Sequence, residues 1–165
     1  MLSYKDFTEY FGSYLTDTKF QAFLTEIFTD LTSYDILNGD YICSDKTGIE
    51  LGFTNNDAIY DDDENIVFEK GNPIFSHFNL YPKSDIIIAV LPFDISFNDT
   101  RATALTKAGN PTKTNQGHAD FLNRDFFVDS YKIDDVIISL DYDTNINTIN
   151  FIQLRDNNLK SDLKL

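Results

Sequence analysis

The chain has 165 residues, is 42% hydrophobic and 15% aromatic, and carries 27 acidic against 13 basic side chains, a net charge of −14. This charge argues against nucleic acid and anionic membranes as partners and favours basic ones, because like charges repel and opposite charges speed association. One domain, or two small and closely packed ones, is expected at this length, and the single Cys43 excludes an internal disulfide framework.

The N-terminal sequence MLSYKDFTEYF has neither the basic segment nor the apolar run of a signal peptide. No apolar run in the chain approaches the roughly 20 residues of a membrane-spanning helix. We therefore expect a cytoplasmic protein. Its many aromatic residues suit half-buried strands. The expected fold class is α+β: an antiparallel sheet with N-terminal helices and one mid-chain helix packed on one face.

Two helices are predicted near the N-terminus. Phe7, Tyr10 and Phe11 recur at helical spacing, and Gly12 ends that segment. Asp17 begins a second segment in which apolar residues recur at steps of three and four. These residues are Phe20, Phe23, Leu24, Ile27, Phe28 and Leu31. The pattern predicts an amphipathic helix with one face in the core, and we expect Phe23 and Ile27 to be buried.

Short strands are predicted over the next fifty residues. A turn at 45–48 separates two strands, the second of which alternates apolar Ile49, Leu51 and Phe53 with other residues. A hairpin pairing 65–69 with 74–80 follows the acidic run at 61–64. The apolar segment IIIAVLPF then fits a buried strand.

The stretch LPFDISFNDTRATALTKAGNP at 91–111 is predicted to organise the chain. Ile95 and Phe97 alternate with polar neighbours, as in a strand, and we expect Phe93 to be buried. Asn98 or Asp99 caps a helix that ends at 109–111.

The C-terminal third is predicted to be a polar loop at 112–118 followed by a three-strand meander. The strands are expected at 125–131, 134–142 and 147–154, with Ile138 on the buried face. Two segments echo each other, because LTDTKFQAFL and FNDTRATALT each place Asp-Thr and a basic residue before a helix. We interpret 1–165 as a single domain with two pseudo-repeats, 1–82 and 86–155; chance similarity in a chain rich in Asp, Asn and Thr is the alternative.

Catalytic and metal-binding motifs are absent from the sequence. His77 fits a sheet position, whereas His118 lies in a polar segment, and a pair between Cys43 and His118 is an open alternative. The run from Asp141 to Asn147 begins like a calcium loop but has Ile146 where glycine is needed. We expect no cofactor, no metal and no enzymatic activity.

The segments PIFSHFNLYP and LPFDISFNDTRATALTKAGNP, with strands carrying GIELGF and VIISLDY, resemble immunity proteins of bacterial toxin–immunity pairs. The pairs in question are those of contact-dependent inhibition and related polymorphic toxins. The helix that ends before a meander is also similar to the unit repeated in beta-lactamase inhibitor protein and in SmpA/OmlA lipoproteins, although this chain has no lipobox. The first resemblance implies a protein that binds its cognate toxin and blocks its active site.

We therefore expect a toxin-neutralising binder whose acidic side chains meet Lys and Arg in a basic toxin, for which a nuclease is the leading candidate. The expected partner-binding residues are Asp61, Asp62, Asp63 and Glu64, a second patch of Asp141 and Asp143, and the aromatic Tyr60 and Tyr81. A small enzyme using Cys43 or His118, and a non-toxin adaptor, are the alternatives.

Overall fold

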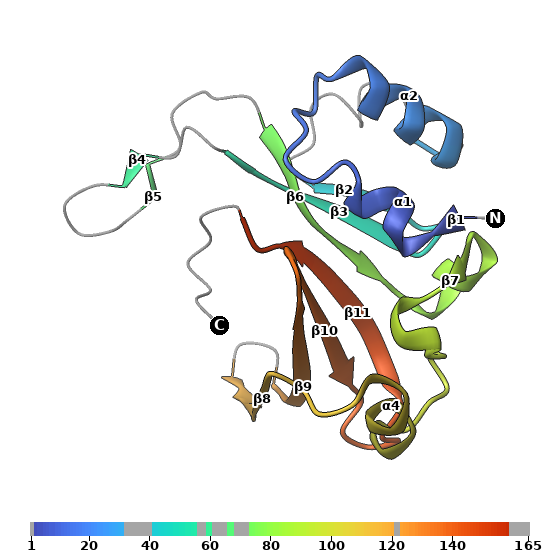
Figure 1. Ribbon diagram of the computed structural model, residues 1–165, viewed down its shortest axis with the longest axis vertical. Helices are drawn as coiled ribbons and strands as arrows, with labels where there is room; N and C mark the ends of the chain where they lie inside the picture. The colour runs from blue at the N-terminus through green and yellow to red at the C-terminus, as the bar shows by residue number, and fades with distance from the viewer. Residues whose placement is uncertain are drawn as a thin grey trace.

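The computed structural model describes residues 2–31, 41–55, 59–60, 66–67, 73–120 and 123–158. Within these residues the chain forms a seven-stranded antiparallel sheet with helices on one face (Figure 1), as the sequence predicts. The sheet strands are β2 (Tyr41–Ser44), β3 (Ile49–Asn55), β6 (Pro73–Leu80), β8 (Lys113–Ala119), β9 (Arg124–Ile133), β10 (Val136–Tyr142) and β11 (Ile149–Asp156).

The strand order is β2-β3-β6-β11-β10-β9-β8, so the last strand of the chain lies at the centre of the sheet. β6 pairs on one side with β3 and on the other with β11, where Leu80 faces Ile152 and Phe78 faces Leu154. The predicted meander at the C-terminus is confirmed as β9-β10-β11. A two-stranded hairpin, β4 (Ile59–Tyr60) with β5 (Ile66–Val67), lies outside the large sheet.

The two N-terminal helices cover the β2-β3-β6 half of the sheet (Figure 1). α1 (Tyr4–Thr8) begins at Ser3, whose hydroxyl accepts from Lys5 N–H while Asp6 accepts from the Ser3 N–H. α2 (Thr18–Ile27) begins at Asp17, whose carboxylate accepts from the N–H groups of Lys19 and Phe20. These side chains satisfy amides that the first turn leaves unpaired, which fixes where each helix starts.

The core lies between these helices and one face of the sheet. Fully buried side chains from α1, α2, β3 and β6 meet there: Phe7, Phe20, Leu24, Leu51, Phe75 and Phe78. Phe75 and Phe20 stack with ring centroids 5.0 Å apart. Alternation along β10 turns Ile138 and Leu140 to the same face, so one core runs across the sheet.

Four residues predicted to be buried have different environments. Ile138 is 2% exposed, as expected. Phe23, Ile27 and Phe93 are only half-buried and pack against the edge of the core. Helical spacing identifies the apolar face of α2 correctly, but the side chains at the margin of such a face keep part of their surface in water.

The segment between β6 and the third helix is less regular than predicted. A 3-10 turn (Pro82–Ile86) leads into IIIAVLPF, which forms the short strand β7 (Ile88–Val90), paired with β1 (Leu2–Ser3), and enters a second 3-10 turn (Pro92–Asp94). Ile86 is 66% exposed, so the expected buried strand is wrong there. Ile95 and Phe97 are buried, but neither lies in a strand: Ile95 follows the second 3-10 turn and Phe97 is in a turn.

The mid-chain helix α4 (Arg101–Ala108) packs over the β9-β10 end of the sheet (Figure 1). Its N-cap is Thr100, one residue after Asp99 and two after Asn98, the two predicted caps. The helix ends at Gly109, which has φ 80° and ψ −163°, a conformation open almost exclusively to glycine. The predicted helix stop is therefore correct, and its reason is the positive φ.

An ion pair fastens α4 to the sheet. Arg101 Nε donates to Asp129 Oδ2 at 2.7 Å and Nη2 donates to Oδ1 at 3.2 Å, and Thr114 Oγ1 adds a bond to Oδ1 at 2.6 Å. The Arg101 guanidinium also lies 4.6 Å from the centre of the Phe127 ring. Asp129 is fully buried, and its charge is stabilised because three donor groups converge on it.

Two strand predictions are wrong. Residues 112–118 are expected to be a loop, but all of them except Thr112 lie in the edge strand β8, whose exposed side chains show no alternation because neither of its faces is deeply buried. The predicted hairpin of 65–69 with 74–80 does not form, because Ile66–Val67 pair with β4 while β6 pairs with β3 and β11. None of the helices in the described segments is long and apolar enough to cross a membrane.

Candidate partner-binding surface

The second face of the sheet, which we call the open face, carries no helix among the described residues. Alternation along the strands places Glu50, Asn79, Ser139 and Gln153 on this face, because their neighbours Leu51, Phe78, Leu140 and Leu154 point into the core. A large sheet face on which no described helix packs is a candidate surface for a partner.

A row of hydrogen bonds crosses the open face. Glu50 Oε2 accepts from Tyr81 Oη at 2.8 Å and from Asn79 Nδ2 at 3.1 Å. Gln153 Nε2 donates to Asn79 Oδ1 at 3.0 Å, and Arg155 Nη2 donates to Gln153 Oε1 at 3.2 Å. The row connects β3, β6 and β11 and holds these side chains in fixed positions, so this part of the surface is ordered before any partner arrives.

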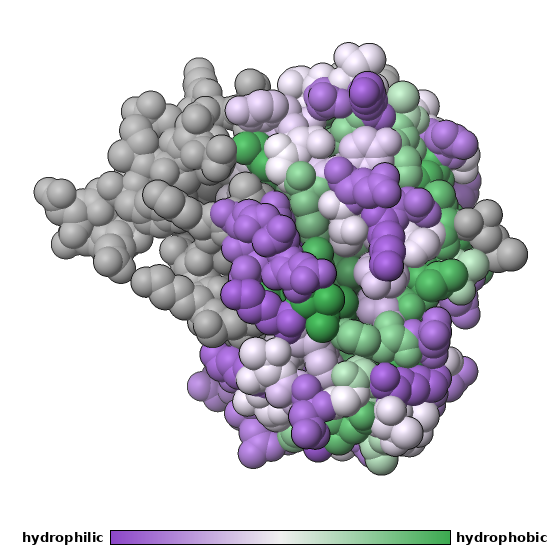
Figure 2. All heavy atoms as spheres, in the orientation of Figure 1, coloured by the Kyte–Doolittle hydropathy of each residue, from purple (hydrophilic) through white to green (hydrophobic). Residues whose placement is uncertain are grey.

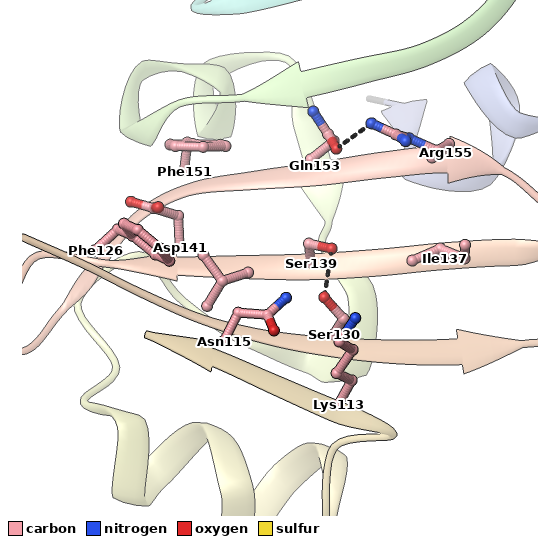
Figure 3. A pocket seen from close by; sticks show the side chains of 11 residues that line it. Lys113, Asn115, Phe126, Ser130, Ile137, Ser139, Asp141, Phe151, Gln153 and Arg155 are labelled. Atoms are coloured by element: carbon pink, nitrogen blue, oxygen red, sulfur yellow. Dashed lines mark hydrogen bonds between the residues drawn. The ribbon is translucent and has the colours of Figure 1, made fainter. Parts of the chain in front are cut away.

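A groove beside this row runs over β8, β9, β10 and β11 and encloses about 240 Å³ (Figure 3). Its lining residues are Lys113, Asn115, Phe126, Val128, Ser130, Ile137, Ser139, Asp141, Phe151, Gln153 and Arg155. This volume is below the roughly 300–1,000 Å³ of most small-molecule sites. The groove therefore suits one side chain or a short peptide segment better than a nucleotide cofactor.

Asp141 lies at one end of this groove, on β10, and is 5% exposed. Its Oδ1 accepts from Asn150 Nδ2 at 3.1 Å, and its Oδ2 lies 4.0 Å from Arg124 Nη2. Burial raises the pKa of this carboxyl; the Asn150 hydrogen bond and Arg124 oppose the shift, and Asp143 adds to it. The charge of Asp141 is thus held in a site with little compensation.

Asp143, predicted to act in the same patch, has a different role in the structure. Its Oδ1 accepts from Asn145 N–H at 2.8 Å and from Ile146 N–H at 3.1 Å, which closes the turn between β10 and β11. These backbone hydrogen bonds lower the pKa of its carboxyl. Asp143 therefore adds negative charge near Asp141 but does not line the groove.

Tyr81, the predicted aromatic contact, lies on the open face close to the groove. Its hydroxyl donates to Glu50, and its ring centroid is 5.6 Å from that of Phe151. Phe151 is the cross-strand neighbour of Asp141. The fold therefore brings together Tyr81 and Asp141, which are 60 positions apart in the sequence.

The remaining predicted contacts cannot be placed. Asp61, Asp62, Asp63 and Glu64 lie outside the described residues, and Tyr60 is described only as part of the backbone of β4. The groove residues Phe126, Val128 and Phe151 were not predicted. Their only signal in the sequence is that apolar residues recur at alternate positions on the strand face opposite the core. The same pattern is expected for a strand that is buried on both faces, so the sequence alone does not separate the two cases.

The alternative pair of Cys43 and His118 is contradicted by the topology. Cys43 is on β2 and His118 on β8, the two edge strands, so six strand spacings of about 4.8 Å separate them. Partial burial, followed by Glu50 and Asp45, raises the pKa of the Cys43 thiol, which disfavours the reactive thiolate.

The two histidines also have structural surroundings. His118 Nδ1 lies 2.8 Å from Asp125 Oδ1, and its Nε2 lies 3.8 Å from Asp120 Oδ1. His77 packs over Gly52 on the open face, and its Nδ1 lies 2.9 Å from Ser76 Oγ. In the part of the chain that the structure describes, no group of three or more His, Cys, Asp or Glu side chains could hold a metal ion.

Comparisons with protein-family models, with curated proteins and with solved structures found no match for this chain.

Proposed function

We propose that this protein binds a basic bacterial toxin and neutralises it by covering the active site of the toxin. The observation that carries the proposal is the charge, 27 acidic against 13 basic side chains. A field of this sign attracts a protein whose surface is rich in Lys and Arg and accelerates its encounter. Nucleases fit this description, because their substrate grooves hold phosphates with basic side chains.

The open face offers the contacts that such a complex needs. Aromatic side chains that become fully desolvated supply much of the affinity at protein interfaces. Tyr81, Phe126 and Phe151 reach this face, and the hydrogen-bonded row from Glu50 to Arg155 lies beside them. Rigid side chains lose little conformational entropy on binding, which favours a tight complex.

Neutralisation of this kind requires no chemistry from the chain. A partner that covers the substrate groove of an enzyme excludes the substrate, and charge complementarity sets both the encounter rate and the choice of partner. The separation of Cys43 from His118 across the sheet agrees with such a mode of action.

The direct test is to produce the protein together with the product of the neighbouring reading frame. If that product is toxic in a bacterial host, co-production should restore growth, and the purified pair should form a complex measurable by calorimetry. A complex without growth rescue would favour the adaptor alternative. Absence of both binding and rescue would refute the proposal.

The acidic run that the sequence singles out can be tested by charge removal. Four positions are changed together: Asp61→Asn, Asp62→Asn, Asp63→Asn and Glu64→Gln. Association with the toxin should slow on the order of tenfold at low salt. At about 0.5 M salt the difference should shrink, because the screening length falls to about 4 Å.

The matched control removes four exposed charges elsewhere: Glu26→Gln, Asp85→Asn, Asp134→Asn and Asp135→Asn. Both variants have the same net charge, so a general field effect slows both equally. A slower association confined to the first variant places the contact at the acidic run. Equal association rates for the first variant and the wild type at every salt concentration would remove the run from the interface.

A further inference from the structure

Asp141 is a buried carboxylate that opens onto a groove instead of onto the core. It is 5% exposed and receives one side-chain hydrogen bond, from Asn150 at 3.1 Å. The nearest guanidinium nitrogen, Arg124 Nη2, is 4.0 Å away, which is too long for a hydrogen bond. A carboxylate can accept about four hydrogen bonds, so much of the capacity of Asp141 is unused among the described contacts.

Apolar and aromatic side chains surround this carboxylate. Across the strands, Asp141 lies beside Phe151 on β11 and Val128 on β9, and Phe126 is two residues further along β9. Figure 3 shows Phe126 and Phe151 at the Asp141 end of the groove. Burial among such residues raises the pKa of the Asp141 carboxyl, and it would strengthen an ion pair formed there.

The opposite face of the sheet, which the helices cover and which we call the covered face, has a buried carboxylate that is paired with both an arginine and an aromatic ring. There the Asp129 carboxylate receives Arg101 through two hydrogen bonds, at 2.7 and 3.2 Å, and the guanidinium lies 4.6 Å from the centre of the Phe127 ring. The cross-strand partner of Asp129 is Leu140, the residue next to Asp141. On the open face, Asp141 provides the same combination of a buried carboxylate beside aromatic rings, but no described arginine binds it through two hydrogen bonds.

The two basic residues of the groove lie away from this end. Lys113 pairs across the sheet with Ser130, at the level of Ser139, which is two residues from Asp141 on β10. Arg155 lies at the level of Ile137, four residues from Asp141, and donates to Gln153. At about 3.4 Å per residue these separations are about 7 and 14 Å along the strand.

We infer that the Asp141 end of the groove receives the guanidinium of one arginine side chain of the bound partner. The guanidinium makes hydrogen bonds to the Asp141 carboxylate and stacks on the faces of Phe126 and Phe151. Arginine fits better than lysine because its planar group combines bidentate pairing with stacking, whereas an ammonium group is a compact and strongly hydrated charge. The inference rests on the proposed function, since it names the group by which the basic partner is anchored.

A consequence distinguishes this role from a structural one. Asp141→Asn keeps the size of the side chain and an oxygen that accepts from Asn150, but it removes a buried charge with little compensation. The free protein should therefore have a higher Tm with Asn at this position, while arginine binding is lost. A residue that serves only the fold would lower Tm when its charge is removed.

The experiment uses three small probes on the isolated protein: the N-acetyl N-methylamides of arginine, lysine and citrulline. Citrulline has nearly the shape of arginine without its charge. Binding is followed by NMR through the backbone amides of Asn115, Val128, Ser139 and Gln153, all of which lie in the groove. We expect saturable shifts for the arginine probe at about millimolar concentrations, weaker ones for lysine and none for citrulline.

Asp141→Asn should weaken arginine binding at least about tenfold, the loss expected when a buried charge pair is broken. Asp134→Asn is the matched control, because it removes the same charge from the exposed turn at the other end of the β9-β10 hairpin. It should change the affinity less than about twofold, since an exposed charge is screened. Phe126→Leu keeps the carboxylate and should weaken binding several-fold by removing one aromatic face.

Equal binding of citrulline and arginine would overturn the inference. Unchanged arginine binding in a folded Asp141→Asn variant would do the same, as would equal losses in the Asp141→Asn and Asp134→Asn variants. If Asp141→Asn failed to fold, Phe126→Leu would still decide whether the probe binds at this end of the groove. Because the probes need no toxin, a negative result here leaves growth rescue by the wild-type protein as a separate question.

Discussion

The two faces of the seven-stranded sheet differ in composition and in burial. The covered face is built from side chains with no exposed surface, such as Phe75, Phe78 and Leu80 on β6. The open face of the same strand carries His77 and Asn79, and further along the sheet it carries a groove. Hydrophobic residues also reach the surface in scattered patches among hydrophilic ones (Figure 2). The largest fully buried side chains of β6 therefore lie on the covered face, whereas the open face presents polar side chains and the groove.

Asp129 and Asp141 show the same difference at the level of single residues. Both are buried on adjacent strands, but Asp129 has three bonds from Arg101 and Thr114, whereas Asp141 has one from Asn150. A charge that is fully paired within the fold contributes to the fold. A charge that is incompletely paired and faces a groove is stabilised further when a ligand arrives.

The largest expected effect is on the covered face. Phe75 is fully buried, and its ring centroid lies 5.0–6.0 Å from those of Phe11, Phe20, Phe53 and Phe78. Phe75→Ala should lower the free energy of unfolding by about 3–5 kcal/mol, because it leaves a cavity that the neighbours cannot fill.

The matched variant on the open face is Phe151→Ala, which truncates a half-buried ring. It should cost about 1 kcal/mol, since less surface is lost from a packed environment. Urea unfolding of both variants measures the difference. Equal losses would show that the open face contributes to stability as much as the core does.

The next effect concerns pH. Burial, and then nearby Arg155, lower the pKa of His77 from 6.5 to about 4. As the pH falls, the unfolded chain therefore protonates this imidazole before the folded protein does. The contribution of neutral His77 to the free energy of unfolding is complete above about pH 6.5 and is lost as the pH falls towards 4. At about 1.4 kcal/mol for each pH unit, the loss at pH 4 is about 3 kcal/mol.

His77→Gln should remove this part of the acid dependence, and His118→Gln should leave it in place. The measurement is urea unfolding of the three proteins between pH 7 and pH 4. The same pH slope in the His77→Gln variant and the wild type would contradict the assignment.

A smaller effect is expected where the open face is tightly packed. A Cβ at Gly52 would clash with both Cε1 and Nε2 of His77, so the ring must move. Gly52→Ala should cost about 1–3 kcal/mol by overpacking. In a His77→Ala background the same change should cost much less, and a double-mutant cycle measures this coupling. An additive cycle would refute the contact.

The smallest effect is expected at the end of α4. Gly109 has φ 80°, and nothing lies within 4 Å of a Cβ placed there, so Gly109→Ala tests the backbone alone. The cost should be about 1 kcal/mol, measured by thermal unfolding. Gly12, with φ 81° and equally open surroundings, is the matched site and should respond alike. Stability unchanged at Gly109 but reduced at Gly12 would show that the helix end adjusts to the substitution.

Local patterns predicted the elements in which a single face is apolar. The spacing from Phe20 to Phe28 identified α2, and alternation at Val136, Ile138 and Leu140 identified β10. The stop at Gly109 was equally clear. In these elements the apolar residues mark the buried face directly, so a short window of sequence is sufficient to predict the helix or strand.

Features that depend on distant contacts could not be predicted. β8 has no alternation, and its strand conformation comes from pairing with β9. The partners of β6 are also decided by the whole sheet. Of the predicted site residues, Asp141 and Tyr81 lie on one surface, but the sequence did not indicate that Phe151 joins them. Which face of a strand stays uncovered is a property of the complete fold.

The central pairing of β6 with β11 also has a consequence for how the chain folds. Gln153 bonds to Asn79 across 74 positions of sequence, whereas β9, β10 and β11 are connected by short turns. Local hairpins close with little loss of chain entropy, and distant strands close with more. We therefore expect the β9-β10-β11 meander to form early and the pairing of β6 with β11 to form later. Folding should then take milliseconds to seconds, as for other chains rich in non-local strand pairs.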